Sequence, residues 1–276
     1  MSTLVNEPEG GSRLAERVSD AALAVYIALF VIFLLAPIVI VVMTSFTPGE
    51  TVAVSLDGMS LRWYRRFLEY RPFTDSLITS LMIAALATVF AILFAVPAAL
   101  GIATSRSRLA NAVTSFLLSP IAVPPLVVGL SSLYYLSELG IGNSFVALLI
   151  THTCVSVPYV LRTTIAACRN LDPRFGEAAS VLGASAWQRF AHVTLPLISP
   201  GVFAGALFSV LISLDNLGVS YFFGSATTTT LPVVMLSYLQ NQFDPSIAAI
   251  STVQMLIAIV LLVVVEKIYG LRAINN

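Results

Sequence analysis

The side chains that could carry out chemistry in this sequence are few and scattered. His152 and Cys154 lie two positions apart, which places them on different faces of a helix. No carboxylate accompanies them, so we do not expect them to form a metal site. His192 has no nucleophile or acid at a recognisable spacing. The sequence therefore predicts no catalytic residues and no metal ligands.

A phosphate-binding loop is also excluded. Such a loop needs Gly-Lys-Ser/Thr after a glycine-rich turn. The sequence has a single lysine, Lys267, which stands between Glu266 and Ile268. Cys154 and Cys168 lie in or beside one apolar segment, and we interpret them as packing residues. We expect no cofactor in this chain.

Asp215 is the acidic side chain that stands out, because it follows the uncharged stretch Phe190–Leu214. In a membrane a carboxylate costs about 2.5–3.5 kcal/mol, so it usually faces a cavity or a partner. Asn216 follows directly and Tyr221 is close behind, a combination that suits a small ammonium-bearing solute through ion pairing and cation–π contact. We predict that Asp215, Asn216 and Tyr221 line a substrate path. The alternative is a structural Asp215 that caps backbone or pairs with an arginine across a subunit interface.

The composition identifies the environment of these residues. Hydrophobic residues make up 58% of the 276 residues and charged residues 10%, with a mean hydropathy of +0.93. Soluble domains carry about a quarter charged residues. The chain therefore reads as an integral membrane protein in contact with the lipid bilayer. Its formal net charge of zero gives no indication of a nucleic-acid partner.

The uncharged stretches predict an all-α protein with six transmembrane helices, since a span needs about 20 mostly apolar residues. The first uncharged stretch, Ala21–Gly49, is longer than a signal-peptide core, which has about 7–15 residues. The sequence after Asp215 turns polar at "GSATTTTLP", so we expect no separate span there. The predicted helices are 21–46, 76–104, 112–137, 141–165, 197–223 and 245–269.

The basic residues orient these helices, because Lys and Arg gather on the cytoplasmic side. Four lie on one side, namely Arg62, Arg65, Arg66 and Arg71. The other side holds Arg13, Arg17, Arg106, Arg108, Arg162, Arg169, Arg174, Arg189, Lys267 and Arg272. We therefore expect both termini in the cytoplasm, with a cytoplasmic tail of residues 1–20 and a six-helix transmembrane domain of residues 21–276.

Two further patterns concern helix shape. Pro37, Pro97 and Pro158 lie inside predicted spans, and "SPIAVPPLVVG" in the third span predicts a broken helix that faces protein or a cavity. A packing kink is the alternative.

In "SLRWYRRFLEYR", Leu61, Tyr64 and Leu68 would share one helical face, which indicates an interfacial helix with Trp63 and Tyr70 at headgroup depth. A solvated loop fits this short stretch equally well.

The segment between the fourth and fifth predicted spans is polar and helix-prone. Asp172 is a good N-cap and Pro173 suits the first helical position. Gly183 should interrupt this helix, and a second helix, "SAWQRFAHV", should end at Pro196. From the residues alone, this short helix pair could be a docking element for a soluble partner or a plain connecting loop.

The order of residues in this segment resembles a known motif. Glu177-Ala178-Ala179 is followed by three residues, Gly183, nine residues and Val193-Thr194-Leu195-Pro196. This resembles the EAA loop of the permease subunits of bacterial ABC importers, whose pattern is EAA, three residues, Gly, nine residues, Ile, one residue, Leu-Pro. Val193 in place of isoleucine departs from it conservatively. The loop spans about residues 166–196, and the six predicted helices are similar to the type I importer permease fold.

The resemblance implies a non-enzymatic permease subunit in the bacterial cytoplasmic (inner) membrane. Its loop would contain a coupling helix that docks into a groove on a cytoplasmic ATPase. The implied partners are a second permease subunit in a heterodimer, two ABC ATPase subunits that bind ATP and Mg, and a periplasmic or lipid-anchored solute-binding protein. On this resemblance the ATPase-coupling residues are Glu177, Ala178, Ala179 and Gly183, with Trp187 and Arg189 added.

The solute is less closely defined. The stretch from "SLDNLGVSYFFG" to "QNQFDPSIAAIST" is similar to the second permease subunit of spermidine/putrescine importers. Asn216 stands where those permeases typically show a second acidic residue, and Ile121 stands where they can carry an aspartate. We therefore expect a polyamine-like or other amine-bearing solute that has fewer positive charges or is held mainly by the partner permease. Alternatives are opine-like compounds, phosphonates, thiamine or iron. An ion-coupled secondary transporter would need a second buried acid or a repeat, and a structural scaffold would not explain the proline-broken helices.

Overall fold

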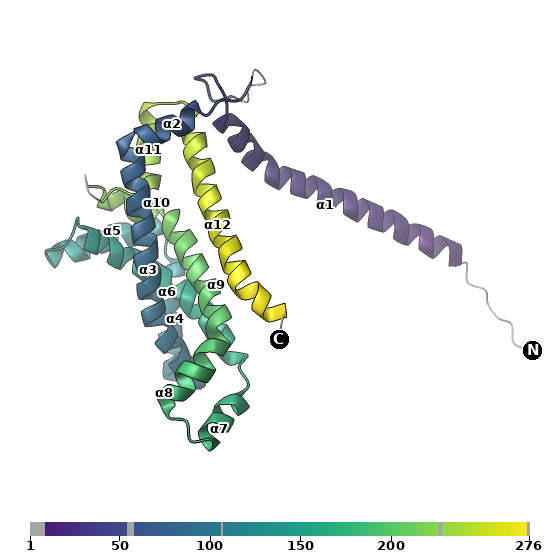
Figure 1. The fold of residues 1–276 in the computed structure, drawn as a ribbon, viewed down its shortest axis with the longest axis vertical. Helices are drawn as coiled ribbons and strands as arrows, with labels where there is room; N and C mark the ends of the chain where they lie inside the picture. The colour runs from purple at the N-terminus through teal and green to yellow at the C-terminus, as the bar shows by residue number, and fades with distance from the viewer. Residues whose placement is uncertain (1–8, 54–57, 106, 226–227, 275–276) are drawn as a thin grey trace, which may run out of the picture. The chain divides into compact units, whose positions relative to one another are not determined.

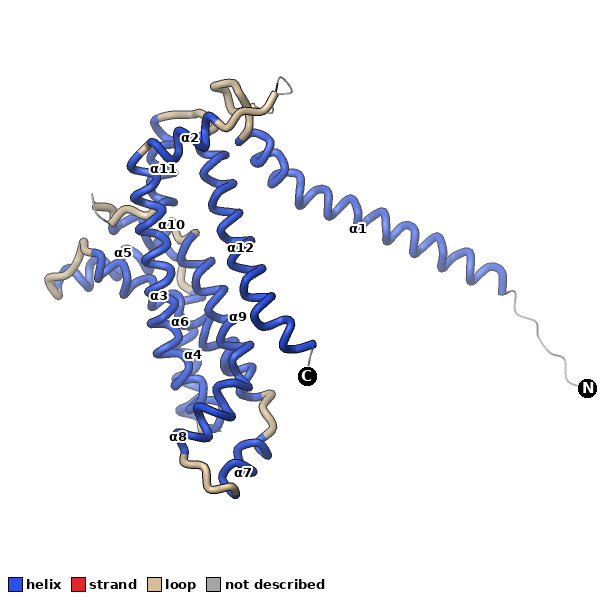
Figure 2. The backbone as a smooth tube through the Cα atoms, in the orientation of Figure 1, coloured by secondary structure: helices blue, strands red, loops and turns tan. Residues whose placement is uncertain are grey.

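The structure, a computed structural model, describes residues 9–53, 58–105, 107–225 and 228–274, and every element found in them is helical (Figure 2). Arg106 and residues 1–8 of the predicted tail lie outside the described residues. The α-helices are α1 Glu9–Ser45, α2 Arg62–Glu69, α3 Arg71–Thr104, α4 Arg108–Leu118, α5 Pro125–Glu138, α6 Phe145–Arg169, α7 Pro173–Val181, α8 Ala186–Arg189, α9 Leu195–Leu214, α10 Leu217–Ser220, α11 Leu231–Asn241 and α12 Ser246–Ile274. Three short helical turns join them: η1 Ser119–Ala122, η2 Phe190–Thr194 and η3 Tyr221–Phe223.

Among the described residues, five helical runs are long and apolar enough to cross a membrane, and a bent pair makes six when it is counted as one span, which confirms the predicted all-α fold. The runs are Ser19–Ser45, Arg71–Thr104, Phe145–Arg169, Ala186–Leu214 and Ser246–Val264. The bent pair is Arg108–Ala122 with Pro125–Glu138. Several predicted boundaries were shifted by a few residues, because α1, α3 and α4 begin among charged residues that a count of uncharged stretches leaves out.

The chain forms two compact units, residues 1–65 with 244–252 and residues 66–243 with 253–276. In the first unit, the run Ser19–Ser45 of α1 contains an 18-residue window of highest hydropathy. None of the side chains in that window is buried. In the second unit, α3, α6 and α9 pack side by side and form the centre (Figure 1). All further sites described below lie in this second unit.

Small residues bring the central helices close together. Ala91, Ala95 and Ala99 recur every four residues along α3 and pack against Val160 and Leu161 of α6. In a membrane, where lipid is as apolar as leucine, close van der Waals packing of small residues is a main source of helix association. The alanine stripe therefore explains why α3 and α6 form the most extensive helix pair.

Only one of the predicted proline sites breaks its helix. α1, α3 and α6 continue through Pro37, Pro97 and Pro158. In contrast, α4 and α5 meet at a bend of 107° across Ser119–Pro125. A single proline removes one helical hydrogen bond, whereas at this break two prolines follow each other, and Pro125 begins the next helix after the extended Val123 and Pro124. The predicted broken helix is thus confirmed.

The fifth span differs from its prediction at both ends. Residues 186–214 form one helical run in spite of Pro196, so the predicted stop there was wrong. The helix continues past the proline because a π turn precedes it. In that turn Leu195 N–H donates to Phe190 O, five residues back rather than four. At its other end the helix stops at Leu214 instead of reaching 223, because Asn216 caps a separate short helix, α10.

The stretch at 60–71 is a helix, α2, but the buried face was predicted wrongly. Trp63 and Phe67 are buried, while Leu61 and Leu68 are exposed. The Trp63 indole N–H donates to Thr47 O at 2.9 Å, so this ring lies inside the fold rather than among headgroups. The spacing of Trp63 and Phe67, four residues apart, defines the true face.

Candidate functional site

Two regions of the larger unit carry the residues singled out from the sequence. One is the segment 172–194, which contains α7, α8 and η2 and lies at one end of the central helices (Figure 1). The other is a pocket at the break after α9. Each is built by different contacts.

Helix α7 begins and ends with local capping motifs. Asp172 Oδ1 accepts a hydrogen bond from Arg174 N–H at 2.9 Å, which confirms the predicted N-cap. At the other end Gly183 has a φ of +83°. Gly183 N–H donates to Ser180 O and Ala184 N–H donates to Ala179 O, both at 3.0 Å. This is the Schellman motif, which favours glycine because the left-handed conformation strains other residues.

Helix α8 starts on a capping box. Ser185 Oγ accepts from Gln188 N–H at 3.3 Å, and Gln188 Oε1 accepts from Ser185 N–H at 2.8 Å. These two bonds satisfy donors that a helix start otherwise leaves free. The turn between α7 and α8 is therefore fixed by its own residues.

Arg189 braces the two short helices against each other. Arg189 is the last residue of α8, and its Nη1 donates a hydrogen bond to Ser180 Oγ of α7 at 2.7 Å. Gly176 lies beside this side chain, and a Cβ at that position would make an ordinary van der Waals contact, 3.6 Å, with Arg189 Cδ. Arg189 thus serves the shape of the segment, and its guanidinium points to α7.

The tip of the segment presents apolar side chains to the outside. Val181 is 88% exposed, Leu182 87% and Trp187 71%. Glu177 and Ala178 are also exposed, and Ala179 is half-buried. Sequence analysis named Trp187 but missed Val181 and Leu182. Two large apolar residues directly before a helix-ending glycine were the signal that could have indicated them.

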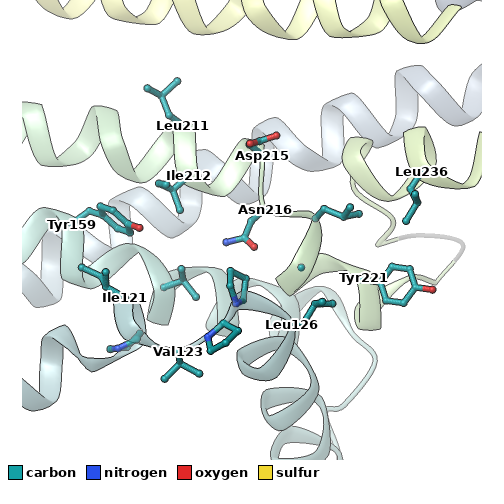
Figure 3. A pocket seen from close by; sticks show the side chains of 16 residues that line it. Ile121, Val123, Leu126, Tyr159, Leu211, Ile212, Asp215, Asn216, Tyr221 and Leu236 are labelled. Atoms are coloured by element: carbon teal, nitrogen blue, oxygen red, sulfur yellow. The ribbon is translucent and has the colours of Figure 1, made fainter. Parts of the chain in front are cut away.

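The second region is a pocket of about 900 Å³ where the breaks of two spans meet (Figure 3). It brings together Asp215, Asn216 and Tyr221 with the proline-rich turn of the third span. The lining residues are Pro120, Ile121, Val123, Pro124, Pro125, Leu126, Val155, Tyr159, Leu211, Ile212, Asp215, Asn216, Leu217, Gly218, Tyr221 and Leu236.

Glycines allow the two breaks to touch. A Cβ at Gly129 of α5 would lie 2.8 Å from Val219 O, and a Cβ at Gly218 would lie 2.8 Å from Pro125 Cβ. Real Cβ atoms do not approach that closely, so any side chain at either position would push α5 and α10 apart. The wall of the pocket therefore depends on these two residues.

The three predicted residues are arranged differently from one another. Asp215 is exposed to the pocket. Asn216 is buried, and its Oδ1 accepts from Val219 N–H at 3.1 Å, which leaves its amide nitrogen facing the pocket (Figure 3). Tyr221 lies farther along, with its hydroxyl directed away from Asp215 (Figure 3). Tyr159 of α6, which sequence analysis missed, points toward the side that holds Asn216 (Figure 3).

Asp215 is the one charged side chain that lines this pocket among the described residues. The helix ends around it add to its field. The negative C-terminal end of α9 lies next to Asp215. The positive N-terminal end of α5 carries Pro124 and Pro125, which have no N–H to offer an anion. The described lining of the pocket thus holds a carboxylate and no basic side chain. No three His, Cys, Asp or Glu side chains gather as metal ligands in the part of the chain that is described.

Comparison with known proteins gives a consistent result. The family model described as binding-protein-dependent transport system inner membrane component matches residues 87–271. The spermidine/putrescine transport system permease protein PotC of Haemophilus influenzae is 31% identical over 236 residues, which cover 86% of this chain and 91% of that protein. The putrescine transport system permease protein PotI of Escherichia coli K12 is 32% identical over 227 residues, 80% of each chain.

Other relatives and solved structures are described with other solutes. The molybdenum transport system permease protein ModB of Mycobacterium tuberculosis is 34% identical over 204 residues, 68% of this chain and 76% of that protein. Among solved structures, a bacterial ABC transporter involved in the import of alginate aligns with a TM-score of 0.73 at 17% identity, over 97% of this chain and 100% of that one. The MetNI methionine ABC transporter aligns with a TM-score of 0.59 at 16% identity, over 72% and 97%.

Proposed function

Because the chain belongs to the family of binding-protein-dependent transport system inner membrane components and is a permease subunit of an ABC importer, we propose that it moves a small amine, of the polyamine class, past Asp215. The observation that carries this is the lone carboxylate of the pocket. Ammonium groups pair with a carboxylate and with aromatic faces such as those of Tyr159 and Tyr221. An oxyanion such as molybdate would meet repulsion from Asp215 and no cation in the described lining.

We further propose that the segment 172–194 docks onto a cytoplasmic ATPase. Glu177, Ala178, Ala179 and Trp187 offer the exposed surface, and Gly183 sets the turn between the two short helices. To these the structure adds Val181 and Leu182, because large exposed apolar side chains outside the lipid indicate a partner surface. Arg189 holds the surface in shape through Ser180.

The two helices that flank this segment connect it to the pocket. The segment lies between α6 and the helical run that begins at Ala186. A Cβ at Gly205 of α9 would lie 2.7 Å from Val160 Cα, and one at Gly201 would lie 2.9 Å from Thr163 O, both on α6. Since the backbones are this close, α6 and α9 move together when the segment is displaced. Tyr159 and Asp215 lie on these same helices and would be carried along.

The complete importer in this proposal contains a second permease, two ATPase copies that bind ATP and Mg, and a periplasmic or lipid-anchored binding protein. The chain lies in the inner membrane of a bacterium with both termini in the cytoplasm, because ten of its basic residues then face inward. The division into a tail of residues 1–20 and a permease domain of residues 21–276 stays a prediction.

The solute is tested with the cognate binding protein and the assembled importer. Putrescine or spermidine should raise the melting temperature of the binding protein and stimulate ATP hydrolysis by the importer in liposomes. Molybdate, a phosphonate and thiamine serve as matched solutes of other classes. Stabilisation and stimulation by one of these, with no response to the amines, would overturn the amine assignment and leave the importer assignment intact.

A further inference from the structure

A buried imidazole joins three helices behind the pocket. His152 of α6 is 1% exposed. Its Nδ1 lies 2.8 Å from Ser213 Oγ, and its Nε2 lies 3.0 Å from Ser220 Oγ. In a neutral ring one nitrogen donates and the other accepts, and each serine hydroxyl can take the complementary role. Both ring nitrogens are thus used in hydrogen bonds inside the protein.

The two serines lie on opposite sides of the break in the fifth span. Ser213 belongs to the last turn of α9, and Ser220 is the last residue of α10. Between them run Asp215 and Asn216, the two polar residues that reach the pocket. One side chain therefore spans the break and ties both of its ends to α6. Because both partners are serines, a shift of either end would leave a buried polar group unpaired.

Other bonds at the break are local or single. Asn216 caps α10 within its own chain segment, and Gln254 Nε2 donates to Leu214 O at 3.4 Å on one side only. Thr88 and Ser209, 2.8 Å apart, join α3 to α9 one turn before Ser213, and they do not reach across the break. Among the hydrogen bonds described, those of His152 alone fix α9 and α10 to the same neighbour.

We infer that His152 is a positioning residue that sets where Asp215 and Asn216 stand in the pocket, through its hydrogen bonds to Ser213 and Ser220. This inference rests on the proposed function for its link to solute affinity, and on geometry alone for the position of residue 215. The ring does not line the pocket and need not touch the solute. It acts on the solute through the backbone that carries Asp215.

The position of residue 215 is measured directly with a cysteine probe. The assembled importer carries Asp215→Cys in a background of Cys154→Ala and Cys168→Ala, and the rate of its modification by a small charged thiol reagent is followed on the permease. His152→Phe, which keeps the ring volume and loses both hydrogen bonds, should raise this rate several-fold. Ser209→Ala, which removes a buried hydrogen bond of the same kind away from the break, should leave it unchanged.

Two conservative variants separate the two hydrogen bonds. His152→Asn keeps a polar group at the place of Nδ1, near Ser213, and His152→Gln keeps one at the place of Nε2, near Ser220. Each should give a modification rate between those of the parent and His152→Phe. If His152→Phe does not assemble, Ser213→Ala and Ser220→Ala remove the same bonds from the other side and should each raise the rate. Equal rates in all assembled variants would overturn the inference.

Solute kinetics then separate this inference from the proposed function. With Asp215 present, His152→Phe should raise the KM for amine uptake with a smaller change in kcat, and the effect should vanish in an Asp215→Asn background because the two changes act on one group. If Asp215→Asn alone has no effect, the solute role of Asp215 fails while the cysteine result still decides the positioning role. If Asp215→Asn impairs uptake and His152→Phe leaves KM unchanged, the positioning role fails.

Discussion

The segment 172–194 and the pocket differ in how far apart in the sequence their stabilising contacts lie. In the segment, the caps at Asp172, Gly183 and Ser185 are made with residues two to five positions away. Around the pocket, His152 bonds to Ser213 and Ser220, and Gly129 faces Val219. The first region is shaped by its own sequence, and the second by the packing of α5, α6, α9 and α10 against one another.

This difference suits the two tasks that we propose for these regions. A surface that receives force from a partner must keep its shape, and short-range caps and the Arg189 brace give it that shape independently of the helices. A pocket that must open to alternate sides needs contacts that can be exchanged as helices shift, and helix-to-helix bonds are of that kind. The following predictions test the contrast, from the largest expected effect to the smallest.

Gly183→Trp should abolish solute-stimulated ATP hydrolysis while the importer still inserts into the membrane. A tryptophan in the left-handed conformation of residue 183 costs roughly 1–2 kcal/mol and places a bulky ring at the docking surface. Gly140→Trp is the matched control, since Gly140 also has a positive φ, of +78°, and open space around it, but lies between α5 and α6. ATPase assays in liposomes measure both. Wild-type coupling in Gly183→Trp would show that the segment does not dock.

Asp215→Asn should leave assembly and basal ATP hydrolysis intact and reduce amine uptake. A lost charge-assisted hydrogen bond is worth about 1.5–3 kcal/mol, so the uptake efficiency should fall by roughly tenfold or more. Uptake of labelled amine over a range of concentrations measures it. Unchanged kinetics would return Asp215 to a structural role.

Gly205→Ala should lower stability by roughly 1–3 kcal/mol through overpacking against α6 and weaken, rather than abolish, the coupling of ATP hydrolysis to uptake. Gly101→Ala is the control, because Gly101 lies in α3 and a Cβ there meets no atom within 4 Å. Thermal melts in detergent and the ratio of solute moved to ATP hydrolysed report the two effects. An undiminished ratio in Gly205→Ala would argue against joint movement of α6 and α9.

The same contrast explains what sequence reasoning could reach. Asp172, Pro173 and Gly183 act through bonds to near neighbours, so the helix pair of segment 172–194 was predictable from residue types and spacing. The spans were predictable because lipid demands long apolar stretches. In contrast, Tyr159 reaches the pocket only because α6 packs beside the break, and His152 finds its serines only after folding.

Two errors show the same limit within single helices. Pro196 was expected to stop a helix, but a π turn at η2 gave the chain another way to place the ring. Helix five was expected to run through Asp215, yet the Asn216 cap starts a new helix after it. In each case the chain could form either of two local hydrogen-bond patterns: a stop or a π turn at Pro196, and a continued helix or a new cap at Asn216. The packing of the surrounding helices selects one of them, and the apolar content of the sequence does not indicate which.

Uptake with and without the ATPase tests the central claim most directly. The permease pair and the loaded binding protein are placed in proteoliposomes, with the two ATPase copies and ATP either present or left out. We predict uptake only in the complete preparation, because movement of the pocket starts at the segment 172–194. Solute uptake at the full rate without any nucleotide-hydrolysing subunit would contradict the account.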